Sequence, residues 1–366
     1  MYIFYILLSV VAIFSHFEIN IGIRENSKKK VLLVLFFIFY LLSFLRWEYG
    51  SDWESYYTHF DAYSWGNLDQ HEIIYMIVLL MSKSIINDYT FVLFCFSSIL
   101  FFFQVKGVSK LSVFPLTTLL VLTGTYFCNV GYVRQYIAVA ILFYSLFFII
   151  ERRFFPFVVC LFLAFGFHYS ALAFFPAYWL FNLKFTRRQL FLFIIVSIFL
   201  STLMSYFLQG FSNVIGIESI IRRTDSYLDQ GYDYDDGGMD SKQKIIRACF
   251  NRGFVILLGF YLLAKERVTN SHLRGFLNLY CFGTILFFMT SPLHVTLTRI
   301  TWYYDFVQIL IIPEIFLFVK KKQPRFLIFM FLVALMFVKM YTTLKNSDNT
   351  MISEYKFIPS IENLLK

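Results

Sequence analysis

The stretch Arg46-Trp47-Glu48-Tyr49-Gly50-Ser51-Asp52-Trp53 follows directly on an apolar run at residues 31–45, which is long enough to cross most of a membrane. Two carboxylates, one arginine, a glycine that lets the chain bend and several aromatic side chains therefore lie at the end of a hydrophobic helix. Residues of these types at a membrane surface can serve simply as anchors. Other polar residues that we predict on the same side make this stretch a candidate functional site.

The composition predicts an integral membrane protein. The 366 residues are 59% hydrophobic and 15% charged, whereas soluble domains contain about 25% charged residues. Apolar runs of about 15–20 residues recur along the whole chain, and such runs span membranes as helices. We therefore predict an all-α, polytopic membrane fold that forms a single transmembrane domain over residues 1–366.

The charge and the cysteines exclude several classes of function. The net charge of +9 comes from short basic clusters between apolar runs, where topology determinants lie, so we expect no nucleic acid partner. The five cysteines are isolated and show no C-x-x-C spacing, so neither a zinc site nor a disulfide framework is indicated. We expect no metal and no cofactor.

The apolar runs predict about 12 membrane spans, judged by helix length against bilayer thickness. The first 17 residues have neither a basic leader nor a small-residue cleavage site, so they are interpreted as a retained span. A further helix at residues 71–86 contains polar positions, and we expect it to lie partly buried or at the interface without crossing. The spans are predicted at residues 1–17, 31–45, 89–105, 113–127, 132–150, 154–167, 171–181, 190–208, 245–264, 276–290, 302–319 and 326–340.

The basic clusters predict which side of the membrane each loop faces. Lysine and arginine mark the cytoplasmic side, and with this number of spans every cluster falls on that side. Both termini then face outward, as do loops at about residues 46–70 and 209–244. The residues predicted at the outer ends of spans are Arg46, Glu48, Asp52, Asn129, Arg134, His168 and Arg299.

Arg134 is placed one turn into an apolar helix, where an unpaired arginine costs about 2.5–3.5 kcal/mol on insertion scales. It could be a snorkelling arginine that pairs with Glu48 or Asp52. Alternatively it binds an anion, because a guanidinium binds phosphate in a bidentate manner and the helix N-terminus adds positive potential. Gln135 could add an amide hydrogen bond.

Arg299 and Arg46 would place two more guanidinium groups on the outer face. Together with Arg134 they oppose two carboxylates, which leaves a surplus charge of about +1 at the site. Such a surplus suits a bound diphosphate better than a neutral substrate.

Three residues are candidates for accepting a proton from a substrate hydroxyl. Asp52 and Glu48 could do so if burial raised their pKa. His168 lies between two short helices, where a histidine can equally form a helix–helix hydrogen bond. Tyrosines near Asp52, among them Tyr56, could stack on sugar rings, and the acidic residues 233–240 are interpreted as an outer loop and not as a calcium site.

These motifs in this order resemble the EpsG-like branch of bacterial polysaccharide polymerases, which are related in role to the Wzy-type O-antigen polymerases. The resemblance covers nearly the whole chain, and no single motif is highly specific. One departure is Ser51, where threonine is expected most often. The matching motifs are Arg46-x-Glu48-x-Gly50-x-Asp52-Trp53-x-x-Tyr56, Asn129 with Arg134-Gln135, Phe167-His168-Tyr169-Ser170-Ala171 with Pro176 after it, Arg299-x-x-x-Tyr303, and a tail at residues 355–359.

The resemblance implies a membrane glycosyltransferase in the bacterial inner membrane with its active face toward the periplasm. Such an enzyme joins oligosaccharide repeat units of O-antigen, capsule or exopolysaccharide that are carried on undecaprenyl diphosphate, and it releases the carrier. The lipid bilayer, the lipid-linked oligosaccharide and a chain-length regulator of the Wzz type are its expected partners.

The resemblance also implies roles for individual residues. Arg134 and Arg299, with Arg46, would stabilise the departing diphosphate. Asp52 or His168, with Glu48 third, would take the proton of the acceptor hydroxyl. The other residues expected to contact substrate are Asn129, Gln135, Tyr56 and Tyr303.

Two other classes of function remain alternatives at this point. A flippase or other transporter of lipid-linked oligosaccharides would need polar residues near the membrane midplane and an internal repeat. An acyltransferase that modifies surface polysaccharides would need its histidine within reach of a cytoplasmic acyl donor. The ionisable residues of this chain are predicted at outer span ends, which favours the polymerase.

Overall fold

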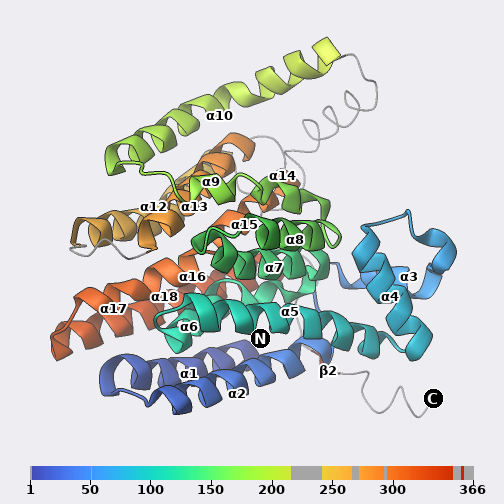
Figure 1. Ribbon diagram of the computed structural model, residues 1–366, viewed down its shortest axis with the longest axis horizontal. Helices are drawn as coiled ribbons and strands as arrows, with labels where there is room; N and C mark the ends of the chain where they lie inside the picture. The colour runs from blue at the N-terminus through green and yellow to red at the C-terminus, as the bar shows by residue number, and fades with distance from the viewer. Residues whose placement is uncertain are drawn as a thin grey trace. The chain divides into compact units, whose positions relative to one another are not determined.

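The computed structural model describes residues 2–50, 52–215, 241–265, 272–291, 295–348 and 356–357 (Figure 1). Most of these residues are helical, and the only strands among them are two of two residues each. Seven helices in this part of the chain are long and apolar enough to cross a membrane. The predicted class, an all-α polytopic membrane protein, is confirmed.

The chain folds into two compact units. Unit 1 comprises Met1–Phe175 and Ile312–Lys366, and unit 2 comprises Pro176–Ile311. That they form one transmembrane domain stays a prediction. The elements of unit 1 are α1 (Tyr2–His16), η1 (Phe17–Ile21), α2 (Glu25–Phe44), β1 (Arg46–Trp47), α3 (Trp53–Ala62), η2 (Trp65–Asn67), α4 (Ile73–Ile85), α5 (Tyr89–Leu111), α6 (Pro115–Thr125), η3 (Phe127–Gly131), α7 (Val133–Ile150), α8 (Phe154–Phe165), η4 (Tyr169–Phe174), η7 (Ile312–Glu314), α17 (Ile315–Phe318), α18 (Lys322–Asp348) and β2 (Lys356–Phe357).

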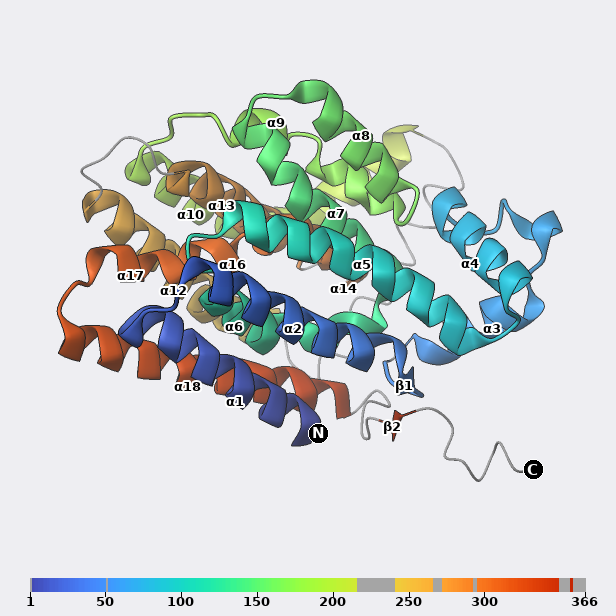
Figure 2. The same cartoon turned by 60° about the horizontal axis from the view of Figure 1, so that its bottom comes forward.

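The core of unit 1 is formed by long helices that lie side by side (Figure 2). Helix α5 packs against both α2 and α7, α7 also packs against α8, and α1 packs against α6 and α18. Two glycines allow these helices to approach closely. A Cβ at Gly107 would lie 2.5 Å from a ring carbon of Phe143, and a Cβ at Gly124 would lie 2.6 Å from Cβ of Met336.

Unit 1 has two chemically different ends. At one end Glu18 caps α6, because its carboxylate accepts hydrogen bonds from the backbone N–H groups of Thr117 (2.8 Å) and Leu116 (3.3 Å). The Lys28 ammonium lies 4.0 Å from that carboxylate. The chain runs the whole length of α2 before it arrives at residues 46–70. These residues therefore lie at the opposite end of unit 1. The basic loop before α2 and the motif that begins at Arg46 therefore lie at opposite ends of α2, and the side of the membrane that each end faces stays a prediction.

The loop after β1 rests on η3. Gly50 has φ +104°, and a Cβ at this position would lie 2.8 Å from the Cα of Gly131, so the two backbones are in contact. The Tyr49 hydroxyl donates a hydrogen bond to the Cys128 carbonyl at 2.9 Å. Because α7 begins directly after η3, this contact fixes the start of α7 relative to the loop that leads into α3.

The two strands join segments from opposite ends of the sequence. Strand β1 pairs with β2 in an antiparallel arrangement, with Arg46 opposite Phe357 and Trp47 opposite Lys356. The C-terminal segment of the predicted family motif is therefore paired in space with the first residues of the opening motif.

Unit 2 is also helical. Residues 216–240, which include the acidic segment, lie outside the described residues, whereas 209–215 and 241–244 belong to helices. Its elements are α9 (Ala177–Leu180), α10 (Arg187–Ile215), α12 (Ser241–Lys265), α13 (Leu273–Thr290), α14 (Val295–Thr298), η6 (Arg299–Thr301), α15 (Trp302–Asp305) and α16 (Gln308–Ile311).

A buried ion pair holds three elements of unit 2 together. The guanidinium of Arg252 on α12 binds both carboxylate oxygens of Asp305 on α15, at 2.5 and 2.6 Å. Thr301 from η6 donates to the same carboxylate at 2.8 Å. A Cβ at Gly283 on α13 would lie 2.9 Å from that carboxylate, so only glycine leaves room for it.

Two predicted spans differ in detail from the structure. Residues 171–181 do not form one helix, because Pro176 separates η4 from α9 and proline cannot continue a helical hydrogen-bond ladder. The predicted span at residues 302–319 consists of α15, α16, η7 and α17, with Pro313 at η7. The number of membrane crossings stays a prediction.

We expect Gly50→Ala to lower the free energy of unfolding by more than the roughly 1–3 kcal/mol that a strained backbone conformation alone costs, because the new methyl group would also collide with Gly131. Gly22→Ala tests strain alone, since Gly22 has φ +96° and no atom lies within 4 Å of the position that a Cβ would take there. Gly66→Ala is the neutral control. Thermal unfolding of the purified proteins in detergent should rank Gly50→Ala lowest, and a melting temperature no lower than that of Gly22→Ala would contradict the contact.

Candidate functional site

Arg134 is the centre of the site. It lies in the first turn of α7, and its Nη1 donates to Glu72 Oε2 at 2.9 Å and to His71 Nδ1 at 3.2 Å. The guanidinium also lies 5.6 Å from the ring centre of Tyr56 and 5.4 Å from that of Tyr75, within the range of cation–π attraction. A carboxylate, an imidazole and two phenol rings thus surround one guanidinium.

The hairpin of α8 and η4 holds Glu72 in place. Its second oxygen accepts a hydrogen bond from the backbone N–H of Tyr169 at 3.3 Å. The backbone N–H groups of Ile74 and Tyr75 both donate to the Gly166 carbonyl, at 2.9 and 3.0 Å. A Cβ at Gly166 would lie 2.4 Å from the Ile74 side chain, so the two segments touch. The start of α4 is therefore locked to the segment that carries His168.

Two histidines extend the cluster away from Arg134. The Nε2 atoms of His59, on α3, and His71 lie 3.1 Å apart. His59 Nδ1 lies 3.1 Å from the Tyr75 hydroxyl, and His71 Nε2 lies 3.3 Å from the Tyr63 hydroxyl. The Lys83 ammonium binds the carbonyls of Phe60, Asp61 and Tyr63 and so fixes the end of α3.

The surroundings keep both imidazoles neutral. Burial, together with the nearby His71 and Arg134, lowers the pKa of His59 to about 4. Burial also lowers the pKa of His71, again with a contribution from Arg134. Protonating His59 in the folded protein is therefore unfavourable, and its contribution to stability is present above pH 6.5 and is lost as the pH falls toward 4.

Aromatic side chains form the outer wall of the site. The rings of Trp53 and Tyr57 are stacked, with centres 5.1 Å apart and planes 9° from parallel. Trp47 from β1 packs edge-on against Trp53, with centres 5.0 Å apart. Tyr57 is exposed, whereas Tyr56 and Tyr49 are buried. Of these tyrosines, Tyr57 is therefore the one that a ligand in solution can reach.

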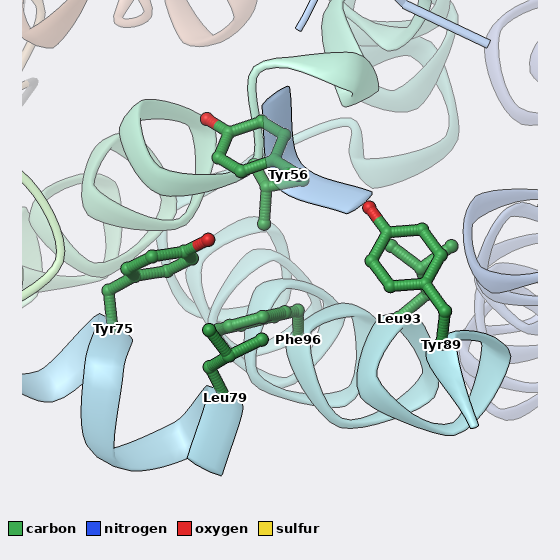
Figure 3. Close-up of a pocket in the computed structure, with 7 residues that line it drawn as sticks. Tyr56, Tyr75, Leu79, Tyr89, Leu93 and Phe96 are labelled. Atoms are coloured by element: carbon green, nitrogen blue, oxygen red, sulfur yellow. The ribbon is translucent and has the colours of Figure 1, made fainter. Parts of the chain in front are cut away.

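A small pocket lies beneath Tyr56 (Figure 3). Side chains from α3, α4 and α5 converge on it, and its remaining space accommodates about one water molecule. The lining is apolar except for three phenol groups. Its residues are Tyr56, Tyr75, Leu79, Tyr89, Leu93, Phe96 and Val133.

The three proposed proton acceptors occupy different environments. Asp52 directly precedes α3, and its carbonyl accepts a hydrogen bond from the backbone N–H of Tyr56 at 3.0 Å, so Asp52 and Arg134 both border Tyr56. Glu48 is exposed and has φ +48°. His168 Nδ1 accepts hydrogen bonds from the Ser170 hydroxyl (2.8 Å) and from the Ser170 N–H (3.3 Å), which caps η4.

The remaining predicted residues divide between the two units. Arg46 is buried and donates to the carbonyl of Ser43, at the C-terminal end of α2, where a cation is favourable. Asn129 lies in η3 and Gln135 is buried next to Arg134 in α7. Arg299 in η6 and buried Tyr303 in α15 belong to unit 2.

Sequence reasoning did not identify several residues of this site. From the sequence, Glu72 is only one of the polar positions of the helix predicted at residues 71–86, and no pattern distinguishes His59, His71 or Tyr75. One signal was present, because a histidine and a glutamate stand side by side at the start of the helix predicted at residues 71–86, directly after the predicted outer loop at about residues 46–70. Among the described residues, no group of three or more His, Cys, Asp or Glu side chains is arranged to hold a metal ion.

Comparison with known proteins identifies one family. The model of the EpsG family matches residues 29–357, which is most of the chain. No curated protein and no solved structure matches the chain.

We expect Glu72→Gln to lower the free energy of unfolding by about 3–5 kcal/mol, because it leaves the largely buried Arg134 without its carboxylate. Glu151→Gln is the matched control. It breaks the ion pair with Arg153 (3.4 Å), whose side chains are 39% and 56% exposed, and should change stability by no more than about 0.5 kcal/mol.

The double variant Glu72→Gln with Arg134→Gln tests the cause of this loss. It should be more stable than Glu72→Gln alone, because no unpaired charge remains. Thermal unfolding of the purified proteins measures all three variants. Equal losses for Glu72→Gln and Glu151→Gln would show that the Arg134–Glu72 pair does not hold the site together.

Proposed function

The chain belongs to the EpsG family, and on this premise we propose that it is a membrane glycosyltransferase that polymerises oligosaccharide repeat units carried on undecaprenyl diphosphate. The growing chain is transferred from its lipid carrier to the non-reducing end of a new lipid-linked unit. Undecaprenyl diphosphate is the leaving group. The protein acts in the bacterial inner membrane, with its active face toward the periplasm.

The observation that carries this proposal is the position of Arg134. Its guanidinium lies at the N-terminal end of α7, so the helix dipole adds to its positive potential. Its present partners include one carboxylate and one neutral imidazole, beside the rings of Tyr56 and Tyr75. A diphosphate oxygen can replace a carboxylate oxygen as acceptor, and it offers a higher charge. Arg134 is therefore suited to stabilise the charge that develops on a departing diphosphate.

The elements around Arg134 supply the rest of the proposed site. Asp52 and His168 are the sequence-based candidates for accepting the proton of the attacking hydroxyl, with Glu48 third. The stacked Trp53 and Tyr57 offer an aromatic surface for a sugar ring next to Asp52. Arg46, Asn129 and Gln135 of unit 1 keep their proposed roles in binding the lipid-linked substrate. The roles proposed for Arg299 and Tyr303, which belong to unit 2, rest on the sequence alone.

The sidedness of the site can be tested by labelling. In a variant whose native cysteines are replaced, Gln70→Cys next to His71 should react with a membrane-impermeant thiol reagent in intact spheroplasts. Ser27→Cys and Gln323→Cys lie in basic clusters that are predicted on the cytoplasmic side, and they should react only after lysis. All three positions are exposed. Labelling of Gln70→Cys and Ser27→Cys from the same side would contradict the periplasmic site.

The reaction itself can be tested with purified protein in liposomes and undecaprenyl-diphosphate-linked repeat units. The wild-type protein should lengthen the oligosaccharide and release one undecaprenyl diphosphate for each glycosidic bond that it forms. Arg134→Lys keeps the positive charge but loses the planar guanidinium, which can donate two hydrogen bonds to one phosphate group. It should therefore lower turnover nearly as much as Arg134→Ala. Arg153→Lys, in a surface ion pair, is the control and should retain activity.

The same assay ranks the sequence-based proton acceptors. Asp52→Asn and His168→Gln keep hydrogen bonding but cannot accept a proton at neutral pH, so loss of the acting base should lower turnover by about 10²–10⁴-fold. A wild-type protein that moves the lipid-linked unit across the bilayer without lengthening it would overturn the proposed function in favour of a transporter.

A further inference from the structure

The hydrogen bonds of the histidine pair determine where its protons lie. A guanidinium can only donate, so the contact between Arg134 Nη1 and His71 Nδ1, at 3.2 Å, requires Nδ1 to be the acceptor. Neutral His71 must then carry its proton on Nε2. That atom faces His59 Nε2 at 3.1 Å, and two N–H groups cannot point at each other at this distance. His59 Nε2 is therefore the acceptor.

The second histidine is fixed by the same reasoning. Because His59 Nε2 carries no proton, its Nδ1 does, and it donates to the Tyr75 hydroxyl at 3.1 Å. The network thus runs in one direction, from Arg134 through His71 and His59 to Tyr75. Tyr75 lies in the pocket beneath Tyr56. Of the two imidazoles, only His71 directs a lone pair, that of Nδ1, toward the Arg134 guanidinium.

The hydrogen bonds of His71 do not suit a metal ion between the two rings. A zinc ion between the two Nε2 atoms would have to displace the proton of His71, while Nδ1 already accepts from Arg134, and would leave an anionic ring. The other charged and titratable groups around His71 are Arg134 on α7, Glu72 beside it, His59 and Tyr63 from α3 and its end, Tyr75 on α4 and Tyr169 on η4.

We propose that His71 is the proton acceptor of the transfer reaction and that Arg134 covers its lone pair until a diphosphate takes up the guanidinium. This inference rests on the proposed function. It adds a base that sequence analysis did not identify, and it couples binding of the lipid-linked donor to activation of the acceptor. His168 is less suited to this role in the present arrangement, because its Nδ1 already accepts two hydrogen bonds from Ser170.

In the proposed step, transfer of a proton to His71 accompanies formation of the glycosidic bond. The O–H bond of the acceptor sugar breaks, and its proton moves to Nδ1 of His71. The oxygen forms the new glycosidic bond to the anomeric carbon of the growing chain. The bond from that carbon to the diphosphate oxygen breaks, and its electron pair leaves with undecaprenyl diphosphate, held by Arg134. The resulting imidazolium shares its Nε2 proton with His59, beside the carboxylate of Glu72.

The variant His71→Asn tests this role. The side-chain oxygen of asparagine can accept the hydrogen bond of Arg134 where Nδ1 does, but it cannot take up a proton. We expect binding of undecaprenyl diphosphate to stay within threefold of wild type, whereas turnover falls by about 10²–10⁴-fold. The remaining rate should rise about tenfold per pH unit, because hydroxide replaces the base. A structural role would not produce this pH profile.

The control is His16→Asn, at a histidine of α1 that packs against Phe326 and Phe329. It should change neither turnover nor its pH dependence. If the wild-type protein polymerises and His71→Asn retains turnover within threefold, the inference is overturned and the proposed function stands. If the wild-type protein does not polymerise, the proposed function fails and the inference fails with it.

A second measurement does not depend on turnover. Nitrogen-15 NMR of histidine-labelled protein in lipid nanodiscs, with His71 assigned by the signal that His71→Asn removes, reports which ring nitrogen carries the proton. At pH 7 we expect an unprotonated Nδ1 and a protonated Nε2. Addition of undecaprenyl diphosphate should shift the Nδ1 signal, because Arg134 leaves it. A protonated Nδ1 in the protein without this lipid would overturn the inference.

Discussion

The ion pair between Arg134 and Glu72 is the interaction on which the rest of the site depends. An arginine near the end of a membrane helix is costly unless a carboxylate or water compensates it. Here the carboxylate comes from the residue just before α4, so neutralising the charge also fixes the position of that helix. The other oxygen of Glu72 binds the N-terminal end of η4. The compensation of the Arg134 charge by Glu72 therefore connects α7, α4 and the segment that carries His168.

Close backbone contacts provide the geometry that this ion pair needs. Gly50 lies against Gly131, and Gly166 lies against Ile74, in both cases with no room for a Cβ. The first contact joins the opening motif to the start of α7, and the second joins α8 to α4. Because these contacts are tight, a small displacement of either segment would also move the groups around Arg134. The glycines therefore influence the geometry of the site from outside it.

Much of the fold was predictable from sequence, because hydrophobic runs and basic clusters report directly on membrane insertion. The sequence predicts Arg134, Asp52 and His168 at outer ends of spans. The structure brings the segments that carry them together around Glu72 and Tyr56, and which side of the membrane they face stays a prediction. The sidedness argument could not identify the partner of Arg134, which is Glu72 and neither Glu48 nor Asp52. That pairing depends on how α3 and α4 fold back over the start of α7, and no periodicity encodes such a fold. His59 and His71 were missed for the same reason, since their importance comes from being 3.1 Å apart.

The pairing of β1 with β2 has a consequence for the order in which the protein is assembled. Residues 46–47 leave the ribosome early, but the strand that they pair with is made about 300 residues later. At about 5–20 residues per second, this interval is roughly 15–60 s. During that time α2 is already made, while the edge of β1 remains open to other segments. The pairing that covers this edge therefore forms only after synthesis has reached residue 357.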